Sequence, residues 1–390
     1  MSKNIVILGS TGSIGKSTLN SIDRKKNFKV ILLSANKNIS ELLKQCLNYK
    51  VKNAIIEDEK KYIKYKKIFE NKNIKIFLDL KNIDKILNKK INYCVNSITG
   101  IDGLEPMLKI IPYTNKILIA NKESIICGWD FILRKLKKFN TEFIPIDSEH
   151  FSIWKLTKNE NINKVDKIIL TASGGPFLNK KKKEISNIEP KFALKHPNWK
   201  MGKKISIDSA TMMNKIFEYI EAKNIFNLKK NQLSILIHPS SFVHAIIVFK
   251  ENIIKFLAHE TDMSIPISSA LNLHNKFDKK KNYNLISKLN NLKFKKPSSK
   301  QFPLLSIIDM IPENSTFFET ILITINDNLV NKYLNNHINY KSIHLNILKL
   351  LKTPFFVKFY KLKPKNIYDI KSVIQLTNKY VNNNYKNYGN

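Results

Sequence analysis

The sequence predicts an α/β protein with an α/β domain at the amino end, an α+β domain in the middle and a small helical domain at the carboxyl end. Two observations predict this order. Short apolar runs alternate with amphipathic segments through the first part of the chain, which is the pattern of a parallel sheet with crossover helices. The last part has helical periodicity instead. We place the domains at residues 1–147, 148–275 and 313–390, with a connector at 276–312.

The chain opens with a buried strand and a glycine-rich turn. Residues 4–9 form a short apolar run, and Gly9, Gly12 and Gly15 then lead into a helix that we expect to begin near Ile14. Strand, glycine turn and helix in this order are typical of the first unit of a Rossmann-type nucleotide-binding domain. The glycine spacing is one residue longer than in the commonest fingerprint, and such turns also occur for purely structural reasons.

The end of the second strand indicates which nucleotide is bound. The strand is expected at residues 29–34, and an NAD enzyme usually has an acidic residue at this point to bind the ribose 2′-hydroxyl. This chain has Asn36, Lys37 and Asn38 there, with no acid. Because Lys37 can neutralise a 2′-phosphate, the sequence favours NADP.

Later strands bring polar residues to the same edge of the sheet. The strand at residues 116–120 ends in Asn121, Lys122, Glu123 and Ser124, and open α/β sheets bind ligands at the carboxyl ends of their strands. Capping of the next helix is the alternative role for Asn121 and Ser124. Other strands are expected at 54–57, 74–78 and 93–97, with helices near 39–48 and 60–70.

A pair of carboxylates follows the strand at residues 142–147. Asp147 and Glu149 are two residues apart, so both can bind one hard cation if the backbone curls, and Glu218 is the candidate third ligand. Three carboxylates would suit Mg²⁺ or Mn²⁺. The alternative is a helix-capping acid beside a surface glutamate. His150 adjoins the pair, and we do not assign it as a ligand.

A glycine pair after the next strand suggests an anion site. The strand is expected at residues 167–171, and Ser173, Gly174 and Gly175 follow it. Glycines free backbone amides for close approach to an anion, and a neighbouring hydroxyl can donate to a phosphate.

The segment 196–223 carries the densest set of polar candidates. We expect a loop, a strand at 204–208 and a helix that starts at Asp208 or Ser209 and passes Glu221, so that the helix N-terminus could bind a phosphate. An amphipathic helix with a solvated polar face is the alternative. The residues that share this face at three- and four-residue spacing are Thr211, Asn214, Lys215 and Glu218.

The loop from His196 to Gly202 is expected to be a lid. It combines Trp199 with a proline and a glycine, and closure would place the indole over the ligand and exclude water. The alternative is a buried core tryptophan. Beyond the helix we expect antiparallel strands at 233–237 and 245–249, and helices at 315–336, 340–352 and 368–382.

Composition narrows the class of protein. The formal net charge of +36 would normally suggest nucleic acid, but the lysines are scattered rather than clustered, so we expect no nucleic-acid partner. No apolar run is long enough to span a membrane, and we expect no targeting segment before the first strand. Three cysteines without metal-ligand spacing fit a reducing cytoplasm.

Five motifs resemble one enzyme family, in its order and spacing. They are GSTGSIG (9–15), ANKES (120–124), PIDSEH (145–150), SGGPF (173–177) and HPNWKMGKKISIDSATMMNKIFEYIEAK (196–223). The chain is similar through most of residues 1–275 to the 1-deoxy-D-xylulose 5-phosphate reductoisomerases. The resemblance implies NADPH, a divalent cation (Mg²⁺, Mn²⁺ or Co²⁺), a phosphorylated sugar substrate and a homodimer. Asn36, Thr261 and Asp327 depart from the usual family residues.

The resemblance also implies roles for individual residues. Metal ligands would be Asp147, Glu149 and Glu218, and catalytic residues would be Lys122, Glu149, His196 and Lys215. The substrate would be bound by Lys122, Ser148, Glu149, Ser173, His196, Ser209, Asn214, Lys215 and Glu218. The nucleotide would be bound by Thr11, Gly12, Ser13, Ile14, Asn36, Lys37, Asn38, Asn121, Glu123 and Gly202.

The implied reaction converts 1-deoxy-D-xylulose 5-phosphate to 2-C-methyl-D-erythritol 4-phosphate by rearrangement and then reduction, in non-mevalonate isoprenoid synthesis. Two alternatives are weighed against it. One is another NADP-dependent oxidoreductase, such as a semialdehyde or sugar-phosphate dehydrogenase, which would not need a carboxylate metal site. The other is a basic nucleic-acid-binding protein, which would have its lysines and aromatic residues on one face.

Overall fold

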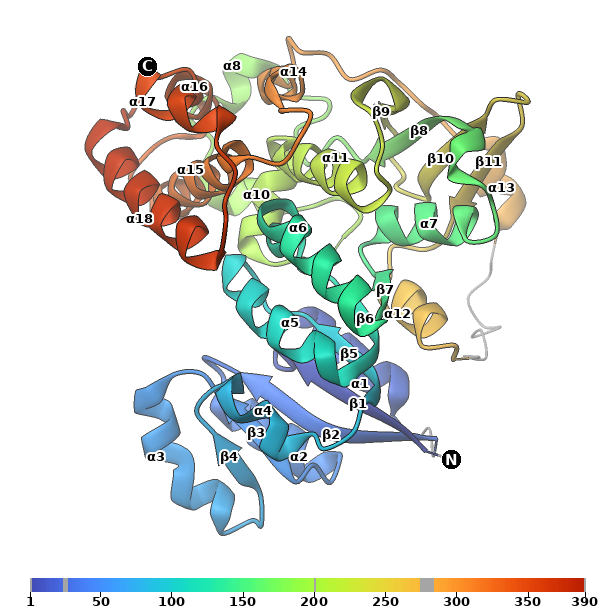
Figure 1. Cartoon of the computed structure of the whole chain (residues 1–390). Helices are drawn as coiled ribbons and strands as arrows, with labels where there is room; N and C mark the ends of the chain where they lie inside the picture. Colours follow the sequence, from blue (N-terminus) through green and yellow to red (C-terminus); the bar gives the residue numbers. More distant parts are fainter. Residues whose placement is uncertain (1, 24–26, 200, 274–283, 389–390) are drawn as a thin grey trace. The chain divides into compact units, whose positions relative to one another are not determined.

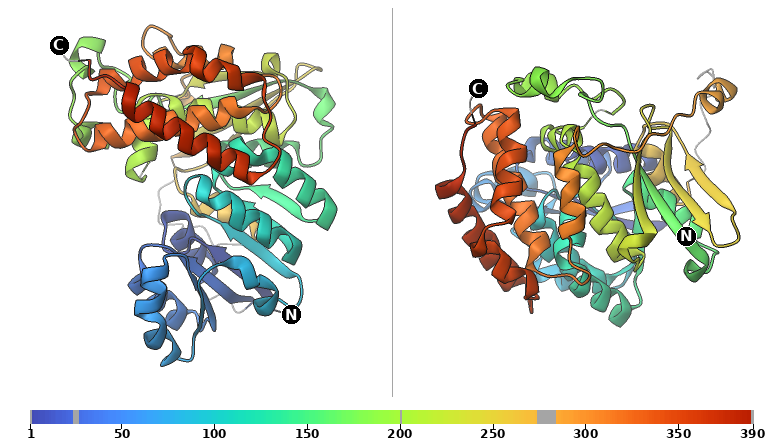
Figure 2. Two further views of the ribbon diagram at one scale, coloured as in Figure 1. Left: turned by 60° about the vertical axis from the view of Figure 1, so that its left-hand side comes forward. Right: turned by 90° about the horizontal axis from the view of Figure 1, so that it is seen from above.

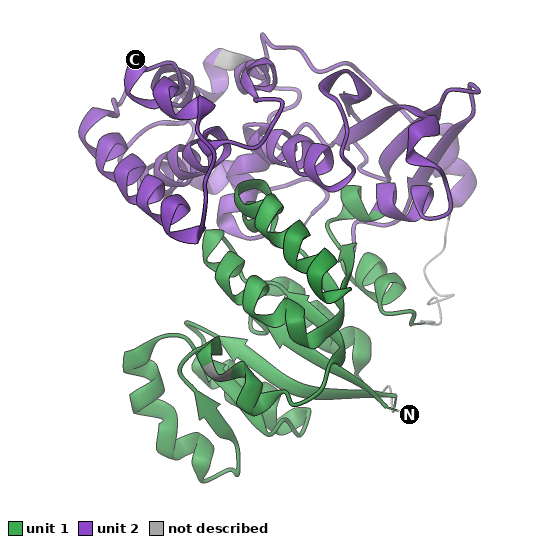
Figure 3. Cartoon of the chain, in the orientation of Figure 1, with its two compact units in different colours: residues 1–151, 263–278 green, residues 152–262, 279–390 purple. Residues whose placement is uncertain are grey.

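The computed structural model describes residues 2–23, 27–199, 201–273 and 284–388. Lys200 of the expected lid, and residues 276–283 of the expected connector, lie outside this part. The chain forms two compact units, residues 1–151 with 263–278 and residues 152–262 with 279–390 (Figure 3). The sequence-based division into domains was linear and did not anticipate that 263–278 belong with the first unit; its boundaries stay a prediction.

The first unit contains a seven-stranded sheet in which every neighbouring pair is parallel (Figure 1). The strand order is β4-β3-β2-β1-β5-β6-β7. Residues Ile5 to Leu8 of β1 are fully buried, as expected for a central parallel strand that is covered on both faces. The bounds are β1 Lys3–Leu8, β2 Phe28–Ala35, β3 Asn53–Ile56, β4 Lys75–Phe77, β5 Ile91–Asn96, β6 Thr114–Ile119 and β7 Glu142–Pro145.

Strand order reverses between β1 and β5, and this position is where a doubly wound sheet opens a crevice for a ligand. The fold is therefore of the Rossmann type, as the glycine turn predicted. The helices of this unit are α1 Ser13–Ile22, α2 Ile39–Asn48, α3 Glu59–Glu70, α4 Ile83–Ile86, α5 Leu104–Ile110, α6 Lys122–Phe139, the start of α7 Ser148–Thr157, and α12 Ser264–Ala270, which packs against α1.

The second unit contains a mixed four-stranded sheet in the order β11-β10-β8-β9. The bounds are β8 Val165–Ala172, β9 Leu233–Ile237, β10 Val243–Phe249 and β11 Ile254–Ala258. The sequence led us to expect antiparallel strands here. That is right for β10, which is antiparallel to β8 and β11, but wrong for β9, which is parallel to β8. Strand β11 was not predicted.

Helices form the rest of the second unit. Helix α15 packs against α16 and α18, and Figure 2 shows the three side by side at the carboxyl end. They match the three helices expected from periodicity. The bounds are α8 Lys182–Ile185, α9 Pro190–Ala193, α10 Lys203–Ala210, α11 Met213–Ile225, α13 Leu285–Asn290, α14 Ile307–Met310, α15 Phe317–Leu334, α16 Tyr340–Leu351, α17 Pro354–Val357 and α18 Ile367–Asn384.

The strand predicted at residues 204–208 is wrong. These residues lie in α10, and a second helix, α11, begins at Met213 after Met212, whose left-handed φ of 64° breaks the two helices apart. Ser209 therefore lies near the end of a helix and not at its start, so the predicted phosphate cradle at a helix N-terminus is also wrong. Alternation of Ile205 and Ile207 with polar residues suggested a strand, but Ser206 and Asp208 of this helix are buried too.

Candidate active site

The glycine turn after β1 presents backbone rather than side chains. Gly9 has φ +76°, and a Cβ there would lie 2.9 Å from backbone atoms of Ser97, so only glycine fits. Gly12 precedes α1, whose first turn has no side-chain cap. Gly12 and Ser13 are exposed. The uncapped start of α1 is a suitable site for a pyrophosphate, with Thr11 and Ile14 half-buried beside it.

The end of β2 lies directly beside this turn. The amide of Gly9 donates to Ser34 Oγ at 3.0 Å, and Asn36, Lys37 and Asn38 are exposed just beyond that strand. Asn38 also caps α2. Lys61 donates to the backbone carbonyl of Lys37 at 2.9 Å and so adds a second cation at the expected 2′-phosphate position. Sequence reasoning missed Lys61 because it belongs to α3, more than twenty residues away.

Asn121 has the capping role that was its alternative. Its Oδ1 accepts from the amide of Ser124 at 2.7 Å, and its Nδ2 donates to the carbonyls of Ile98 and Gly100. These bonds attach the end of β6 to the loop after β5, at the edge where the crevice lies. Glu123 is buried at the start of the same helix. Asn121 thus joins β6, α6 and the loop after β5, and its contact with the nucleotide stays a prediction.

Asp147 is held in place by three neighbours. Its Oδ1 accepts from the amide of Glu149 and lies 3.2 Å from Nδ1 of His150, which is fully buried. Its Oδ2 lies 3.3 Å from Nζ of Lys122, whose side chain is 9% exposed. Hydrogen-bonded neighbours of this kind orient a metal ligand. His150 is thus an orienting residue that sequence reasoning noticed without giving it a role.

Glu149 and Glu218 are both oriented by adjacent polar side chains. Ser148 Oγ donates to Glu149 Oε2 at 2.5 Å. On α11, Asn214 Nδ2 donates to Glu218 Oε1 at 2.5 Å, and Lys215 forms an ion pair with Glu218 Oε2. Lys215 and Glu218 are 4% and 1% exposed. The alternative of an amphipathic helix with a solvated polar face is therefore wrong for these two residues.

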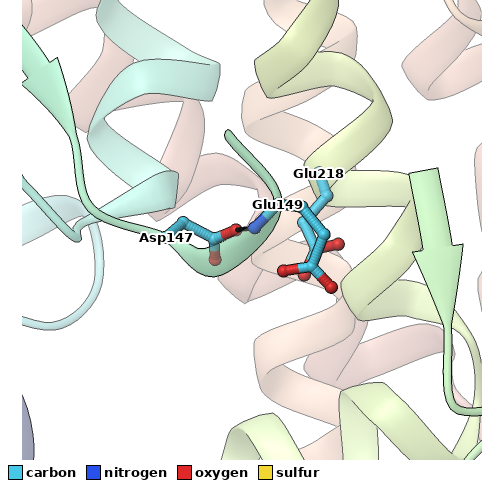
Figure 4. Close-up of side chains that lie close together, drawn as sticks. All are labelled: Asp147, Glu149 and Glu218. Carbon is cyan, nitrogen blue, oxygen red and sulfur yellow. Dashed lines mark hydrogen bonds between the residues drawn. The ribbon is translucent and has the colours of Figure 1, made fainter. Parts of the chain in front are cut away.

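Three carboxylates come together as a candidate metal site. Asp147, Glu149 and Glu218 each offer one oxygen, and these oxygens lie within 4.8 Å of one another (Figure 4). Oxygen-only donors with high negative charge are what Mg²⁺ and Mn²⁺ prefer. The residues therefore fit the cation that the sequence led us to expect, and the ligand set combines a strand end with a helix far away in the sequence.

A serine and a histidine form the candidate anion site in the second unit. The Nδ1 atom of His196 accepts from the amides of Asn198 and Trp199 at 3.1 and 3.0 Å, so its proton is on Nε2. Burial lowers the pKa of His196 to about 4, so the ring is neutral at neutral pH. The Nε2–H then donates to Ser173 Oγ at 3.0 Å.

This tautomer decides what Ser173 can do. Its oxygen accepts from His196 and also from the amide of Gly175 at 3.0 Å, so both lone pairs are used. The hydroxyl hydrogen must then point to a third partner, and it is a donor for an anion. Gly174 and Gly175 have φ of +81° and +69°, which lets the loop fold back around the hydroxyl.

The remaining predicted residues of this unit lie along the segment 198–209. Asn198 donates to the carbonyl of Pro239 and to Ser241 Oγ, and Trp199 is half-buried with its ring edge on His244. Trp199 is therefore not a core residue, although closure of a lid stays a prediction. Gly202 is exposed, with nothing near the position of a Cβ. Ser209 is half-buried at the end of α10.

Comparison with known proteins assigns the chain to a class and then to a family. Three family models match it: the 1-deoxy-D-xylulose 5-phosphate reductoisomerase model over residues 5–128, and two models of the C-terminal domain of that enzyme over residues 143–226 and 259–380. The reductoisomerase of Pelagibacter ubique is 49% identical over 95% of this chain and 96% of its own. That of a Wolbachia from Culex pipiens is 39% identical over 87% and 88%.

Solved structures agree with these matches. The reductoisomerase of Zymomonas mobilis in complex with NADPH has a TM-score of 0.87 at 27% identity, covering 98% of this chain and 99% of its own. A structure with NADPH, fosmidomycin and magnesium has a TM-score of 0.88 at 28% identity, covering 98% of both chains.

The fold and the matches define an NADP-dependent oxidoreductase with a Rossmann-type domain. Within that class, the chain belongs to the 1-deoxy-D-xylulose 5-phosphate reductoisomerase family.

Proposed function

We infer that this chain catalyses the NADPH- and divalent-metal-dependent conversion of 1-deoxy-D-xylulose 5-phosphate to 2-C-methyl-D-erythritol 4-phosphate. Membership of the family supports the reaction, and the observation that carries it here is the cluster of Asp147, Glu149 and Glu218 carboxylates. Other NADP-dependent dehydrogenases do not generally need such a cluster, which favours this reaction over the dehydrogenase alternative.

The buried charges around the carboxylates suit a reaction that develops negative charge on substrate oxygens. When bound, a divalent cation supplies Lewis-acid stabilisation and NADPH supplies the hydride. Lys122 and Lys215 add two positive charges that are already paired with Asp147 and Glu218, so little reorganisation is needed when substrate arrives. Glu149 accepts a hydrogen bond from Ser148, which keeps the Glu149 carboxylate in place. Both residues would bind the carbonyl end of the substrate.

The substrate phosphate is assigned to the second unit. Ser173 has its hydroxyl hydrogen directed away from His196 and Gly175, which makes it a donor to phosphate oxygens. Ser209, Asn214 and Lys215 follow along α10 and α11 and supply further donors to the phosphate and the adjacent substrate hydroxyls. Fixing the phosphate away from the reacting carbons lets its binding energy position them.

The nucleotide is assigned to the first unit. The pyrophosphate would lie on the turn from Thr11 to Ile14, and Lys37 with Lys61 would neutralise the 2′-phosphate. Lys37 and Lys61 lie together beyond the end of β2, where residues 36–38 include no acidic residue, and these two positive charges would favour NADPH over NADH.

One assay tests the reaction. Purified protein is given NADPH and 1-deoxy-D-xylulose 5-phosphate, and absorbance at the nicotinamide band is followed with and without EDTA. We expect oxidation that EDTA stops, that Mg²⁺ or Mn²⁺ restores and that fosmidomycin inhibits. Oxidation that is insensitive to EDTA would contradict the metal assignment, and turnover of a semialdehyde but not of this substrate would favour the dehydrogenase alternative.

We also propose that the chain acts as a homodimer in the cytoplasm. Strand β11 is at the edge of the four-stranded sheet and exposes Ile254 and Phe256 at 63% and 45%, with Ile253 beside them. An apolar edge strand of this kind suits pairing with a second copy. Phe256→Lys should shift the mass measured by light scattering from dimer to monomer, and an unchanged dimer would contradict this interface. The three cysteines are buried thiols, which suits a reducing compartment.

In the described part of the chain, no helix has both the length and the apolar character needed to cross a bilayer.

A further inference from the structure

The end of α10 exposes one residue between two buried ones. Asp208 and Ala210 are each 2% exposed, whereas Ser209 between them is half-buried. A serine at the last turn of a short helix would ordinarily fray, because the final carbonyls of a helix have no partner within it. The packing of its two neighbours therefore decides how precisely the Ser209 hydroxyl is placed.

Asp208 is held from α15. Asn326, which is fully buried in the middle of that helix, donates through Nδ2 to Asp208 Oδ1 at 2.7 Å. Lys204 adds a second connection, because its Nζ lies 3.5 Å from Asp208 Oδ2 and 3.0 Å from Asp327 Oδ1. Helix α10 is thus joined to α15 by a buried hydrogen bond and a bridging lysine.

Ala210 is held from α16. The hydroxyl of Tyr340 donates to the carbonyl of Ala210 at 2.8 Å, which satisfies one of the carbonyls left over at the helix end. The ring is 2% exposed and packs edge-on against Phe177 and Tyr333 at 5.2 and 5.8 Å. Burial raises the pKa of Tyr340 well above its usual value, so the phenol keeps the proton that it donates.

The phosphate loop approaches the same place. A Cβ on Gly175 would lie 2.9 Å from both Ala210 Cα and Ser209 O, so the loop that carries Ser173 touches the end of α10. The two proposed phosphate donors, Ser173 and Ser209, are therefore brought together by backbone contact. Any displacement of Ala210 would change the spacing between them.

We propose that Asn326 and Tyr340 are positioning residues that hold Ser209 in the geometry needed to bind the substrate phosphate. The helical part of the second unit thereby takes part in substrate binding, although neither residue is itself a ligand. This inference rests on the proposed function, specifically on the assignment of Ser209 to the phosphate.

The test uses a matched pair of tyrosine variants. Tyr340→Phe removes only the hydroxyl that holds Ala210. Tyr333→Phe is the control, because Tyr333 is equally buried and its hydroxyl donates at 2.8 Å to the carbonyl of Ile188, outside the proposed site. Thermal unfolding is measured for both, together with KM for 1-deoxy-D-xylulose 5-phosphate and for NADPH.

We expect both variants to lose similar stability, whereas Tyr340→Phe alone raises KM for the sugar phosphate roughly tenfold and leaves KM for NADPH unchanged. Asn326→Ala, which removes the bond to Asp208, should have the same selective effect. Equal sugar-phosphate KM values for Tyr340→Phe, Asn326→Ala and Tyr333→Phe would overturn the proposal and leave the helices a purely structural role.

Ser209→Ala separates failure of this inference from failure of the proposed function. Wild-type KM in Ser209→Ala would mean that Ser209 does not bind the phosphate, so that this assignment and the positioning role would both be wrong, while the reaction itself is tested separately by NADPH oxidation. A raised KM in Ser209→Ala with wild-type KM in Tyr340→Phe would overturn the positioning role alone. If the role is correct, the double variant Ser209→Ala/Tyr340→Phe should have nearly the same KM as Ser209→Ala, because Tyr340 acts through that serine.

Discussion

The expected nucleotide site and the expected substrate site are built in opposite ways. Around Gly12 and Lys37, the candidates are exposed, at a helix start without a side-chain cap and at the end of β2. Around Glu218 and Ser173, the candidates are buried or half-buried and are hydrogen-bonded to one another. The first site can tolerate loss of a contact, whereas the second depends on each partner of a buried network.

This contrast gives an order of expected effects. Removing the charge of Glu218, which is buried and paired with buried Lys215, leaves that lysine uncompensated in a low-dielectric environment, which costs far more than losing an exposed contact. Substitutions in the cluster should therefore affect turnover most, those in the anion loop less, and those at the 2′-phosphate corner should mainly change the choice of nucleotide.

The largest effect is expected for Glu218→Gln. An amide cannot supply the third negative charge of the metal site, so kcat should fall on the order of 10³-fold while Kd for NADPH stays near the wild-type value. Glu221→Gln is the control, since Glu221 is equally buried on the same helix and lies outside the cluster. An equal loss of turnover in the control, or an equal loss of NADPH affinity in Glu218→Gln, would make Glu218 a structural residue.

An intermediate effect is expected for Ser173→Ala. Loss of a hydrogen bond to a charged phosphate should raise KM for the sugar phosphate by about tenfold or more, with little change for NADPH. The chain contains a matched control, because Ser240 Oγ lies 2.9 Å from His238 Nε2 in a similar serine–histidine pair outside the proposed site. If Ser240→Ala raises KM as much as Ser173→Ala does, the serine does not bind the phosphate.

A change of cofactor preference is expected for Lys37→Asp. The new carboxylate should repel the 2′-phosphate, so the ratio of kcat/KM for NADPH over NADH should fall roughly 10- to 150-fold, as expected for a lost charge-assisted contact of about 1.5–3 kcal/mol. Lys44→Asp makes the same charge change at an exposed position of α2 and serves as the control. An unaltered ratio in Lys37→Asp would show that this lysine does not contact the phosphate.

The smallest effect is expected from pH acting on His196. Because burial lowers its folded-state pKa to about 4, the unfolded state binds more protons than the folded state between about pH 4 and 6.5. His196 therefore lowers the free energy of unfolding as the pH falls through this window, and above about pH 6.5 it makes no pH-dependent contribution. The ring resonance of His196 can be assigned because it disappears in His196→Gln, and it should not titrate between pH 5 and 8. A midpoint near 6.5 in the folded protein would contradict the neutral ring, protonated on Nε2, that we assign to His196.

Much of the first unit could be predicted from sequence because its signals are local. Apolar runs gave each parallel strand to within a few residues, and Gly9 is required by the turn itself. The carboxylate ligands came from a resemblance in motifs rather than from periodicity. Lys61 was missed, since its role depends on how α3 returns to the end of β2.

The second unit was harder because tertiary packing overrides local pattern there. Residues 204–208 alternate as a strand would, yet they form a helix that packs against α15 and buries Ser206 and Asp208. Asp208 looked like a helix cap and instead accepts a hydrogen bond from Asn326, 118 residues away. Nothing in the local sequence around Asp208 indicates that partner, so the contact could be found only in the folded chain.

The central claim is that three carboxylates bind one divalent cation, and direct Mn²⁺ binding tests it without relying on turnover. Free Mn²⁺ is counted by electron paramagnetic resonance during titration of wild type, Glu149→Gln, Glu218→Gln and the control Glu221→Gln. We predict one saturable site in wild type and in the control, and a loss of affinity of at least about tenfold in the other two. Equal Mn²⁺ affinity in all four proteins would contradict the account.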